Sequence, residues 1–250
     1  MQTPSFVEMP DLNSARRILA IQPHYDDNDI AVGGTLHLLA KKGVEIIYLT
    51  VTDDLAGVID PAWDKASAMR KLHENQEKAS EIIGVNQHIH LGLPDAGEYD
   101  YFTLRDKLIG FIREITPDFI FTVDPWSPYE AHNDHILTGK ASAEAAILYP
   151  LSQIGRREKS NSSNFALQGV VFYNSAYPNR VFDISDAIQV KQEALSAYTA
   201  QFNSADLEDL IGKITFFAAY IAQEKDFEYG EAFKLVAPWM LHGVPMTRDL

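Results

Sequence analysis

Short apolar runs alternate with longer stretches of helical periodicity along the first 150 residues of the chain. The apolar runs have the length of buried strands, and the stretches between them repeat their apolar residues every three or four positions, as helices do. The predicted strands are Arg17–Ile21, Val44–Val51, Ile89–Leu91 and Phe119–Val123. The predicted helices are Gly33–Lys42, Ala66–Ile83, Leu104–Ile115 and Ile136–Leu148. This alternation predicts an α/β fold with a mostly parallel sheet and helices on both faces.

The regular alternation of predicted strands and helices ends at Pro150. Residues 152–164 are polar and predict a long loop, which we expect to line or cover a site. Two further strands and two further helices are predicted beyond it, at Gly169–Tyr173, Val181–Ile184, Asp186–Tyr198 and Leu207–Ala222. The segment Phe227–Trp239 is rich in aromatic residues and fits either an interface or core. Because no stretch has the composition of a linker, we expect one domain over residues 1–250.

Two polar clusters directly follow predicted strands. Residues 22–29, QPHYDDND, follow the first strand, and residues 130–135, EAHNDH, follow the fourth. In parallel sheets of this kind, ligands bind outside the carboxyl ends of the strands, so both clusters are expected at one edge. Adjacent carboxylates repel each other, more so when partly buried, so Asp26 and Asp27 require a positive partner. A divalent cation would fill that need.

The residue types in these clusters fit hydrolytic metal chemistry. Catalytic zinc sites commonly use two histidines and one carboxylate and leave one position open for water. A further carboxylate can then act as the general base, and a further histidine can stabilise an oxyanion or protonate a leaving amine. Taken singly, each cluster also fits a turn with a helix cap, with Asp134 capping the helix that follows it. Since the chain has no cysteine, any metal must be held by His, Asp or Glu.

The net charge and hydropathy of the chain narrow the range of binding partners that we expect. The formal net charge is −14, which argues against nucleic acid or an anionic membrane as the main partner. No run approaches the ~20 apolar residues of a membrane span, and the N-terminal residues lack the apolar core of a signal peptide. We therefore expect a soluble, cytoplasmic protein with a small-molecule substrate.

Several stretches together resemble one known family. PHYDDNDIAVGGTL at 23–36 resembles the PHPDD…GGT stretch of the PIG-L/LmbE-type zinc-dependent N-deacetylases, and AHNDH at 131–135 resembles their HxDH stretch. Shorter matches follow in the family's order: VTDD at 51–54, EKASEIIGV at 77–85, LGLPDAG at 91–97 and YGEAFKL at 229–235. The resemblance spans nearly the whole chain, and the paired long motifs at this spacing are its most specific part.

This resemblance implies a Rossmann-like fold, one Zn²⁺ per chain and hydrolysis of an N-acetyl group on a glucosamine-type sugar. By motif position it implies three metal ligands, His24, Asp27 and His135. It implies catalytic roles for Asp26 as the general base, His132 as the oxyanion-polarising or acid group, and Asp134 as the residue that orients a histidine. The ligand types would also accept iron, cobalt or nickel.

Departures from the family pattern affect the substrate more than the chemistry. Tyr25 stands where proline is usual and could bring a hydroxyl near the substrate, Asn28 replaces a common glutamate, and Asp54 replaces a common glycine. Further candidates for substrate binding are Asp95, Trp126, Tyr129 and Arg70, each of which also fits a turn, packing or surface role. His37, His73, His88, His90 and His242 show no partner pattern, and we expect structural or surface roles for them.

The sequence thus favours a metal-dependent hydrolase that removes an acetyl group from an N-acetylglucosamine-type sugar. A metal-dependent amidase acting on a larger acyl or thiol-sugar conjugate is the first alternative. A carbohydrate-binding protein without turnover is the second, and the complete set of acidic and histidine residues argues against it, because binding alone needs no base. A homo-oligomer is left open.

Overall fold

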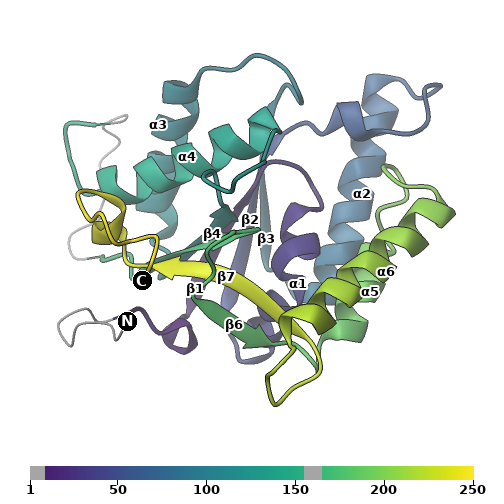
Figure 1. The fold of residues 1–250 in the computed structure, drawn as a ribbon. Coiled ribbons are helices and arrows are strands. Elements are labelled where there is room, and N and C mark those ends of the chain that lie inside the picture. The colour runs from purple at the N-terminus through teal and green to yellow at the C-terminus, as the bar shows by residue number, and fades with distance from the viewer. Residues whose placement is uncertain (1–8, 155–164) are drawn as a thin grey trace.

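The computed structural model describes residues 9–154 and 165–250, and its centre is one sheet (Figure 1). Within the described residues the sheet has seven strands in the order β3-β2-β1-β4-β5-β7-β6. Their bounds are β1 Arg17–Gln22, β2 Glu45–Thr52, β3 Gln87–Leu93, β4 Phe119–Val123, β5 Gly169–Tyr173, β6 Arg180–Asp183 and β7 Gly230–Val236. The strands β1 to β5 are parallel, whereas β7 runs antiparallel to both β5 and β6. The predicted α/β, Rossmann-like class is confirmed.

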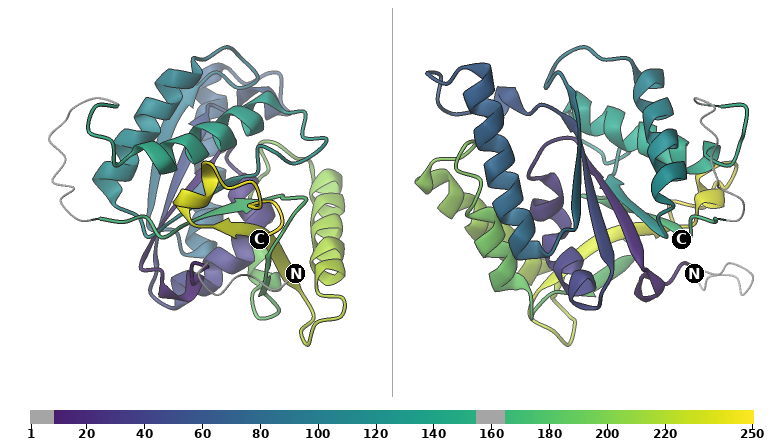
Figure 2. Two further views of the ribbon diagram at one scale, coloured as in Figure 1. Left: turned by 60° about the vertical axis from the view of Figure 1, so that its left-hand side comes forward. Right: turned by 180° about the vertical axis from the view of Figure 1, so that it is seen from behind.

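Helices cover both faces of the sheet (Figure 2). Their bounds are α1 Asp27–Lys41, α2 Lys65–Ile83, α3 Tyr101–Ile115, α4 Asn133–Leu148, α5 Ile188–Leu195 and α6 Ser204–Ile221. On one face α1, α2 and α5 contact one another, and on the other α3 packs against α4. Among the described residues, no helix is long and apolar enough to cross a membrane.

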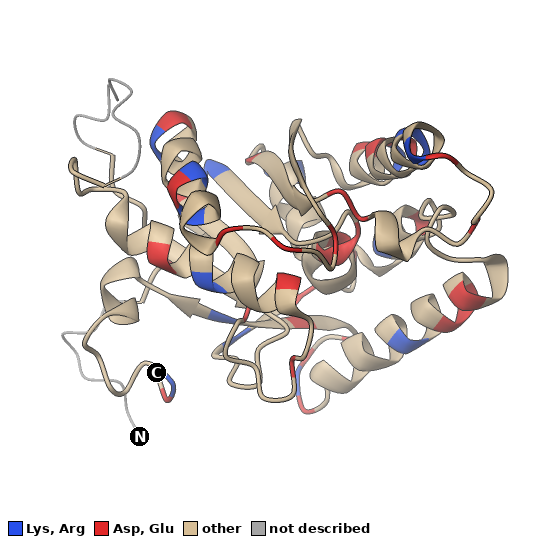
Figure 3. Cartoon of the chain, turned by 90° about the horizontal axis from the view of Figure 1, so that it is seen from above, with Lys and Arg blue, Asp and Glu red and all other residues tan. Residues whose placement is uncertain are grey.

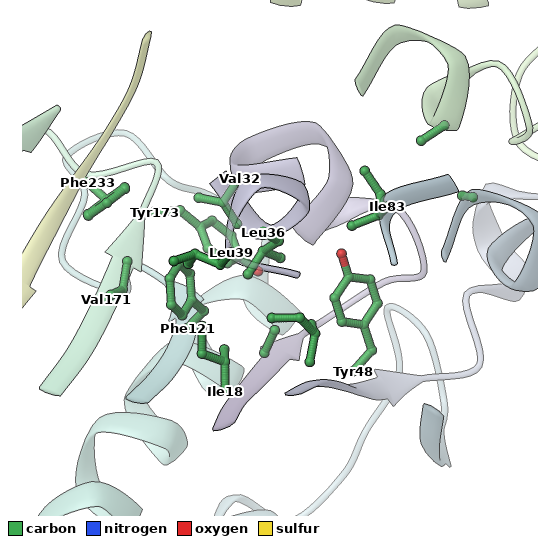
Figure 4. Packing of buried hydrophobic residues seen from close by; sticks show 14 of the residues in the cluster. Ile18, Val32, Leu36, Leu39, Tyr48, Ile83, Phe121, Val171, Tyr173 and Phe233 are labelled. Carbon is green, nitrogen blue, oxygen red and sulfur yellow. The ribbon is translucent and has the colours of Figure 1, made fainter. Parts of the chain in front are cut away.

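The strand β1 shows how the sequence builds two cores. Ile18 and Ala20 lie in the cluster under α1, whereas Leu19 and Ile21 lie in the cluster under α3 and α4. Successive side chains of a strand point to opposite faces, so a continuous apolar run buries both sides. Figure 4 shows the first cluster, where Ile18 and the aromatic side chains of the neighbouring strands pack below α1.

The order of the strands fixes where a ligand can bind. The chain passes from β1 outward to β2 and β3, then crosses back to β4 on the other side of β1. In such sheets the crevice between the two halves lies at this reversal, outside the carboxyl ends of the strands. The two polar clusters of the sequence follow β1 and β4, so the topology brings them to that crevice.

The structure differs most from the prediction at β7, α1 and α5. The strand β7 was not predicted, and it lies inside the sheet between β5 and β6. The first helix begins at Asp27 rather than Gly33, and the predicted helix 186–198 spans only Ile188–Leu195. The predicted loop 152–164 falls mostly on residues 155–164, which lie outside the described residues.

The first helix contains a break that another part of the chain stabilises. Val32 has φ −136° and ψ 15°, so the helix is interrupted there and the backbone N–H groups after it lose their helical partners. Glu231 of β7 accepts two of them, from the N–H of Gly34 at 3.0 Å and of Thr35 at 2.7 Å. The Nζ of Lys191 lies 2.6 Å from Glu231 Oε1, and both side chains are buried. A buried ion pair therefore caps the second half of α1.

Candidate metal centre

The two polar clusters meet at the N-termini of two helices. Asp26 is the N-cap residue of α1 and Asp27 its first residue, while His132 is the N-cap of α4. Asp134 and His135 thus lie in the first turn of α4 rather than in the preceding loop. Figure 3, which looks onto the molecule from above, shows acidic residues gathered near the centre of the view.

One group of side chains converges on Asp27. Its Oδ2 lies 3.3 Å from His24 Nδ1, and its Oδ1 lies 3.4 Å from His135 Nε2. One ligand atom from each of these three residues falls within 4.8 Å of the others, which is close enough for all to contact one ion. Two imidazoles and one carboxylate are the donor set of many hydrolytic zinc sites, so the residues present fit a zinc ion.

A second group shares His24 through its other ring nitrogen. His24 Nε2 lies 3.2 Å from Asp95 Oδ1 and 3.6 Å from Asp134 Oδ2, and His132 Nδ1 lies 3.9 Å from the same Asp134 oxygen. One ligand atom from each of these four residues also lies within 4.8 Å of the others. Both carboxylates already accept hydrogen bonds from other groups. Asp95 accepts one from the backbone N–H of Ala56, and Asp134 accepts from the N–H of Ala96 and the hydroxyl of Tyr99.

The neighbouring histidines offset the repulsion between the adjacent aspartates Asp26 and Asp27. Burial alone would lower the pKa of His24, but the hydrogen bonds to Asp27 and Asp95 raise it to about 11. Burial opposes ionisation of Asp27 as well, yet the hydrogen bond from His24 and the charge of His135 hold its pKa below the ordinary value. The carboxylates thus bind positive charge tightly, and without a cation a proton on the imidazole supplies it.

The pKa of Asp26 is shifted in the opposite direction from that of Asp27. Burial raises the pKa of Asp26 to about 7, and the adjacent charge of Asp27 contributes to the rise. Its side chain caps no backbone N–H of α1. A buried carboxyl of this kind, beside a metal site and close to neutral pKa, can take up and release a proton.

Glu130 belongs to the centre, although the sequence alone did not single it out. Its Oε2 lies 3.2 Å from His135 Nδ1, and its Oε1 accepts the backbone N–H of His132 at 2.8 Å. The contact fixes the ring of His135 so that Nε2 points towards Asp27. The only available signal was its position in the same polar cluster, five residues before His135.

The predicted substrate residues are scattered. Asp95 lies in the centre, against His24. Tyr25 is buried, with its ring against His73 and His90 rather than at the metal centre. Trp126, Tyr129 and Arg70 are exposed. The ring of Trp126 contacts Phe172, and Arg70 donates a hydrogen bond to Ser67 on α2. The structure therefore brings together Asp95 and the six predicted metal and catalytic residues, but not the other four.

The fold and the His/Asp centre define a Rossmann-like α/β protein with a candidate site for one metal ion at the switch point of its sheet. The family model described as GlcNAc-PI de-N-acetylase, PIG-L, matches residues 19–146. The diacetylchitobiose deacetylase of Thermococcus kodakarensis is 31% identical over 238 residues, which cover 94% of this chain and 88% of that protein. The chain belongs to the PIG-L family.

Other relatives extend this comparison. A probable N-acetyl-alpha-D-glucosaminyl L-malate deacetylase 2 of Bacillus cereus is 28% identical over 204 residues, covering 80% of this chain and 89% of that protein. The structure of N,N'-diacetylchitobiose deacetylase from Pyrococcus horikoshii superposes with a TM-score of 0.86 at 28% identity, covering 95% of this chain and 90% of that one. The 4-carboxy-2-hydroxymuconate hydratase GalB of Pseudomonas putida shares the fold, with a TM-score of 0.73 at 16% identity over 88% of this chain and 96% of that one. The fold alone therefore does not fix the reaction.

Proposed function

We propose that this protein is a zinc-dependent N-deacetylase that hydrolyses the N-acetyl amide of a glucosamine-type sugar, acting as a single domain. The observation that carries the proposal is the convergence of His24, Asp27 and His135, with Asp26 beside them, at the switch point of the sheet. Relatives with similar sequences over most of the chain are named as deacetylases of N-acetylated amino sugars.

The geometry favours the group around Asp27 as the metal ligands. The carboxylates of the alternative group, Asp95 and Asp134, already accept hydrogen bonds from backbone N–H groups and a hydroxyl. They also face His24 Nε2, the ring nitrogen opposite to the one that faces Asp27. Carboxylates in that position orient a metal-binding histidine and increase its basicity. Asp95 is thus assigned to hold His24, and Asp134 to hold both His24 and His132.

The remaining side chains supply the proton transfers. A bound zinc ion lowers the pKa of a water molecule towards ~7 and polarises a carbonyl oxygen. Asp26 accepts the proton of the attacking water. His132, whose side chain is 43% exposed at the mouth of the centre, stabilises the oxygen of the tetrahedral intermediate and donates a proton to the leaving amine. The products are acetate and a free amino sugar.

The substrate is expected to carry a substituent beyond the acetylated sugar. The relatives' names share an N-acetylated glucosamine but differ in the group attached to it: a second sugar or L-malate. A cavity of about 300 Å³ lies next to the loop that leads to His132, with Asp124 and Trp126 of that loop in its wall together with Tyr177. Aromatic side chains beside polar groups suit the faces and hydroxyls of a sugar. We assign this cavity to the substituent.

Two other functions are the alternatives to this proposal. A metal-dependent amidase acting on a larger acyl group would use the same centre, and amides of increasing acyl length would distinguish it from a deacetylase. A carbohydrate-binding protein without turnover needs neither Asp26 nor the His132–Asp134 pair. The complete centre therefore favours an enzyme.

Acetate release measured together with metal content tests the proposal. Purified protein is expected to hold about one zinc ion per chain and to release acetate from N-acetylglucosamine or its short β-1,4 oligomers. If the protein binds zinc but releases no acetate, the metal centre would still be supported, and other amides would have to be tested as substrates. Protein that binds no metal, even with zinc supplied, would refute the mechanism.

Removing the carboxylate of Glu130 is expected to weaken metal binding. Glu130→Ala frees the ring of His135, and loss of such a partner typically lowers metal affinity by roughly 10- to 100-fold. Glu130→Gln keeps an oxygen that accepts the Nδ1–H, so its loss should be smaller. Competition with a fluorescent zinc chelator measures both, and Glu81→Ala on the exposed side of α2 is the control. An unchanged affinity in Glu130→Ala would remove this residue from the centre.

A further inference from the structure

Three of the eight histidines gather at a place separate from the metal centre. His88 and His90 alternate on β3, the edge strand of the sheet, so their side chains share one face, and His73 faces them from α2. The ring centroids of His73 and His90 are 4.5 Å apart, and those of His88 and His90 are 6.0 Å apart. The rings thus form a compact group that bridges a helix and a strand.

The electrostatics of this group differ from those of the metal centre. No carboxylate within ion-pair distance of these rings is found in the described residues, unlike at His24. Burial, followed by the charge of His73, lowers the pKa of His90 to about 4, and burial also lowers the pKa of His88. Although part of His90 is open to solvent, its neighbours disfavour protonation. These shifts leave His88 and His90 neutral at physiological pH, and neutral imidazole is the form that binds metals.

Several nitrogen atoms of the group are free to act as ligands. His88 Nδ1 lies 3.1 Å from Gln76 Oε1, which fixes this ring and leaves its Nε2 available. His73 Nε2 is buried without a hydrogen-bond partner, and so is the hydroxyl of Tyr25, whose ring lies against both His73 and His90. Buried polar atoms without partners are uncommon and call for an explanation.

We propose that His73, His88 and His90 form an accessory binding site for a divalent transition metal such as zinc. Zinc–nitrogen bonds of about 2.0–2.1 Å place the ring centroids of two tetrahedral ligands roughly 5 Å apart, close to the spacings found here. Within the described residues only the two groups of the metal centre have converged ligand atoms. Binding of one ion by all three rings would require His90 to rotate, and its exposure and lack of a side-chain hydrogen bond permit such a rotation.

A metal at this place would join the edge of the sheet to a helix. β3 has a strand neighbour on one side only, and the metal would link it to α2 through His73. Tyr25 connects the site with the metal centre, because its ring packs on the accessory histidines while its residue lies between His24 and Asp26. The proposal concerns metal binding and does not depend on the deacetylase reaction.

Zinc analysis of the full-length protein tests the site directly. After dialysis against micromolar free zinc, we expect about two zinc ions per chain in the wild type and about one in His90→Asn and in His73→Asn. The control His242→Asn, which removes an exposed histidine elsewhere, should keep the wild-type content. A zinc content that neither His73→Asn nor His90→Asn lowers below the wild-type value would overturn the proposal.

Thermal unfolding separates this site from the metal centre. A ligand that binds only the folded state raises its stability, so micromolar zinc should still raise the Tm of a His24→Ala variant whose metal centre is impaired. That rise should disappear when His90→Asn is added. If the rise persists in the double variant, the accessory histidines are not the ligands. Failure of the metal centre would instead appear as a wild-type zinc content that His24→Ala leaves unchanged.

Discussion

Replacing Asp26 by asparagine is expected to lower the deacetylation rate by roughly 10²- to 10⁴-fold, the range that a positioned general base contributes. Asparagine has nearly the same shape as aspartate but cannot accept the proton of the attacking water. The three proposed ligands His24, Asp27 and His135 remain in place. The steady-state rate on an N-acetylated chito-oligomer should therefore fall, while the zinc content of the same preparation stays at the wild-type level.

The matched control is Asp118→Asn. Asp118 is partly buried and accepts the backbone N–H groups of Arg16 and Arg17 at the start of β1, at the opposite edge of the sheet from the metal centre. This variant should retain the wild-type rate. If Asp26→Asn turned over at the wild-type rate with zinc bound, another group would be the base, and the pairing of one aspartate as ligand with its neighbour as base would be wrong.

The fold was largely predictable because most strands are continuous apolar runs. Residues 44–51, VEIIYLTV, could hardly form anything but a buried strand, and the alternation with helices then implied a parallel sheet. The strand β7 was missed because GEAFKLV carries two charged residues, Glu231 and Lys234. Both are buried, since Glu231 pairs with Lys191 and Lys234 donates to the backbone oxygen of Arg248. A local sequence pattern cannot predict contacts between residues that are this far apart in the chain.

The convergence of the two polar clusters was predictable to a similar degree, whereas the roles of the residues as ligands and catalytic groups stay predictions. The positions of the two clusters after β1 and β4 were enough to place them at one edge, and the resemblance named the residues. The contact between His24 and Asp95 joins positions 71 apart in the chain, and only the folded structure reveals it. The early start of α1 was missed because its first turn is polar and because the helix is broken at Val32.

Replacing Lys191 by methionine is expected to lower the free energy of unfolding by about 3–5 kcal/mol, the usual cost of removing one partner from a buried ion pair. The carboxylate of Glu231 would remain buried with only the backbone N–H groups of Gly34 and Thr35 as donors. Urea denaturation of the purified protein measures the change. Lys213→Met is the control, because Lys213 pairs with Asp209 on the exposed surface of α6 and should contribute less than about 1 kcal/mol.

Removing Glu231 should cost more than removing Lys191. In Glu231→Leu the buried ammonium of Lys191 and two backbone N–H groups all lose their acceptor at once, whereas Lys191→Met leaves the carboxylate with two donors. The two N–H groups begin the second half of α1, whose first half carries Asp27, so the loss should also reduce zinc affinity. If the two variants were equally destabilised, the ion pair alone would account for the stability, and Glu231 would not serve as the cap of the broken helix.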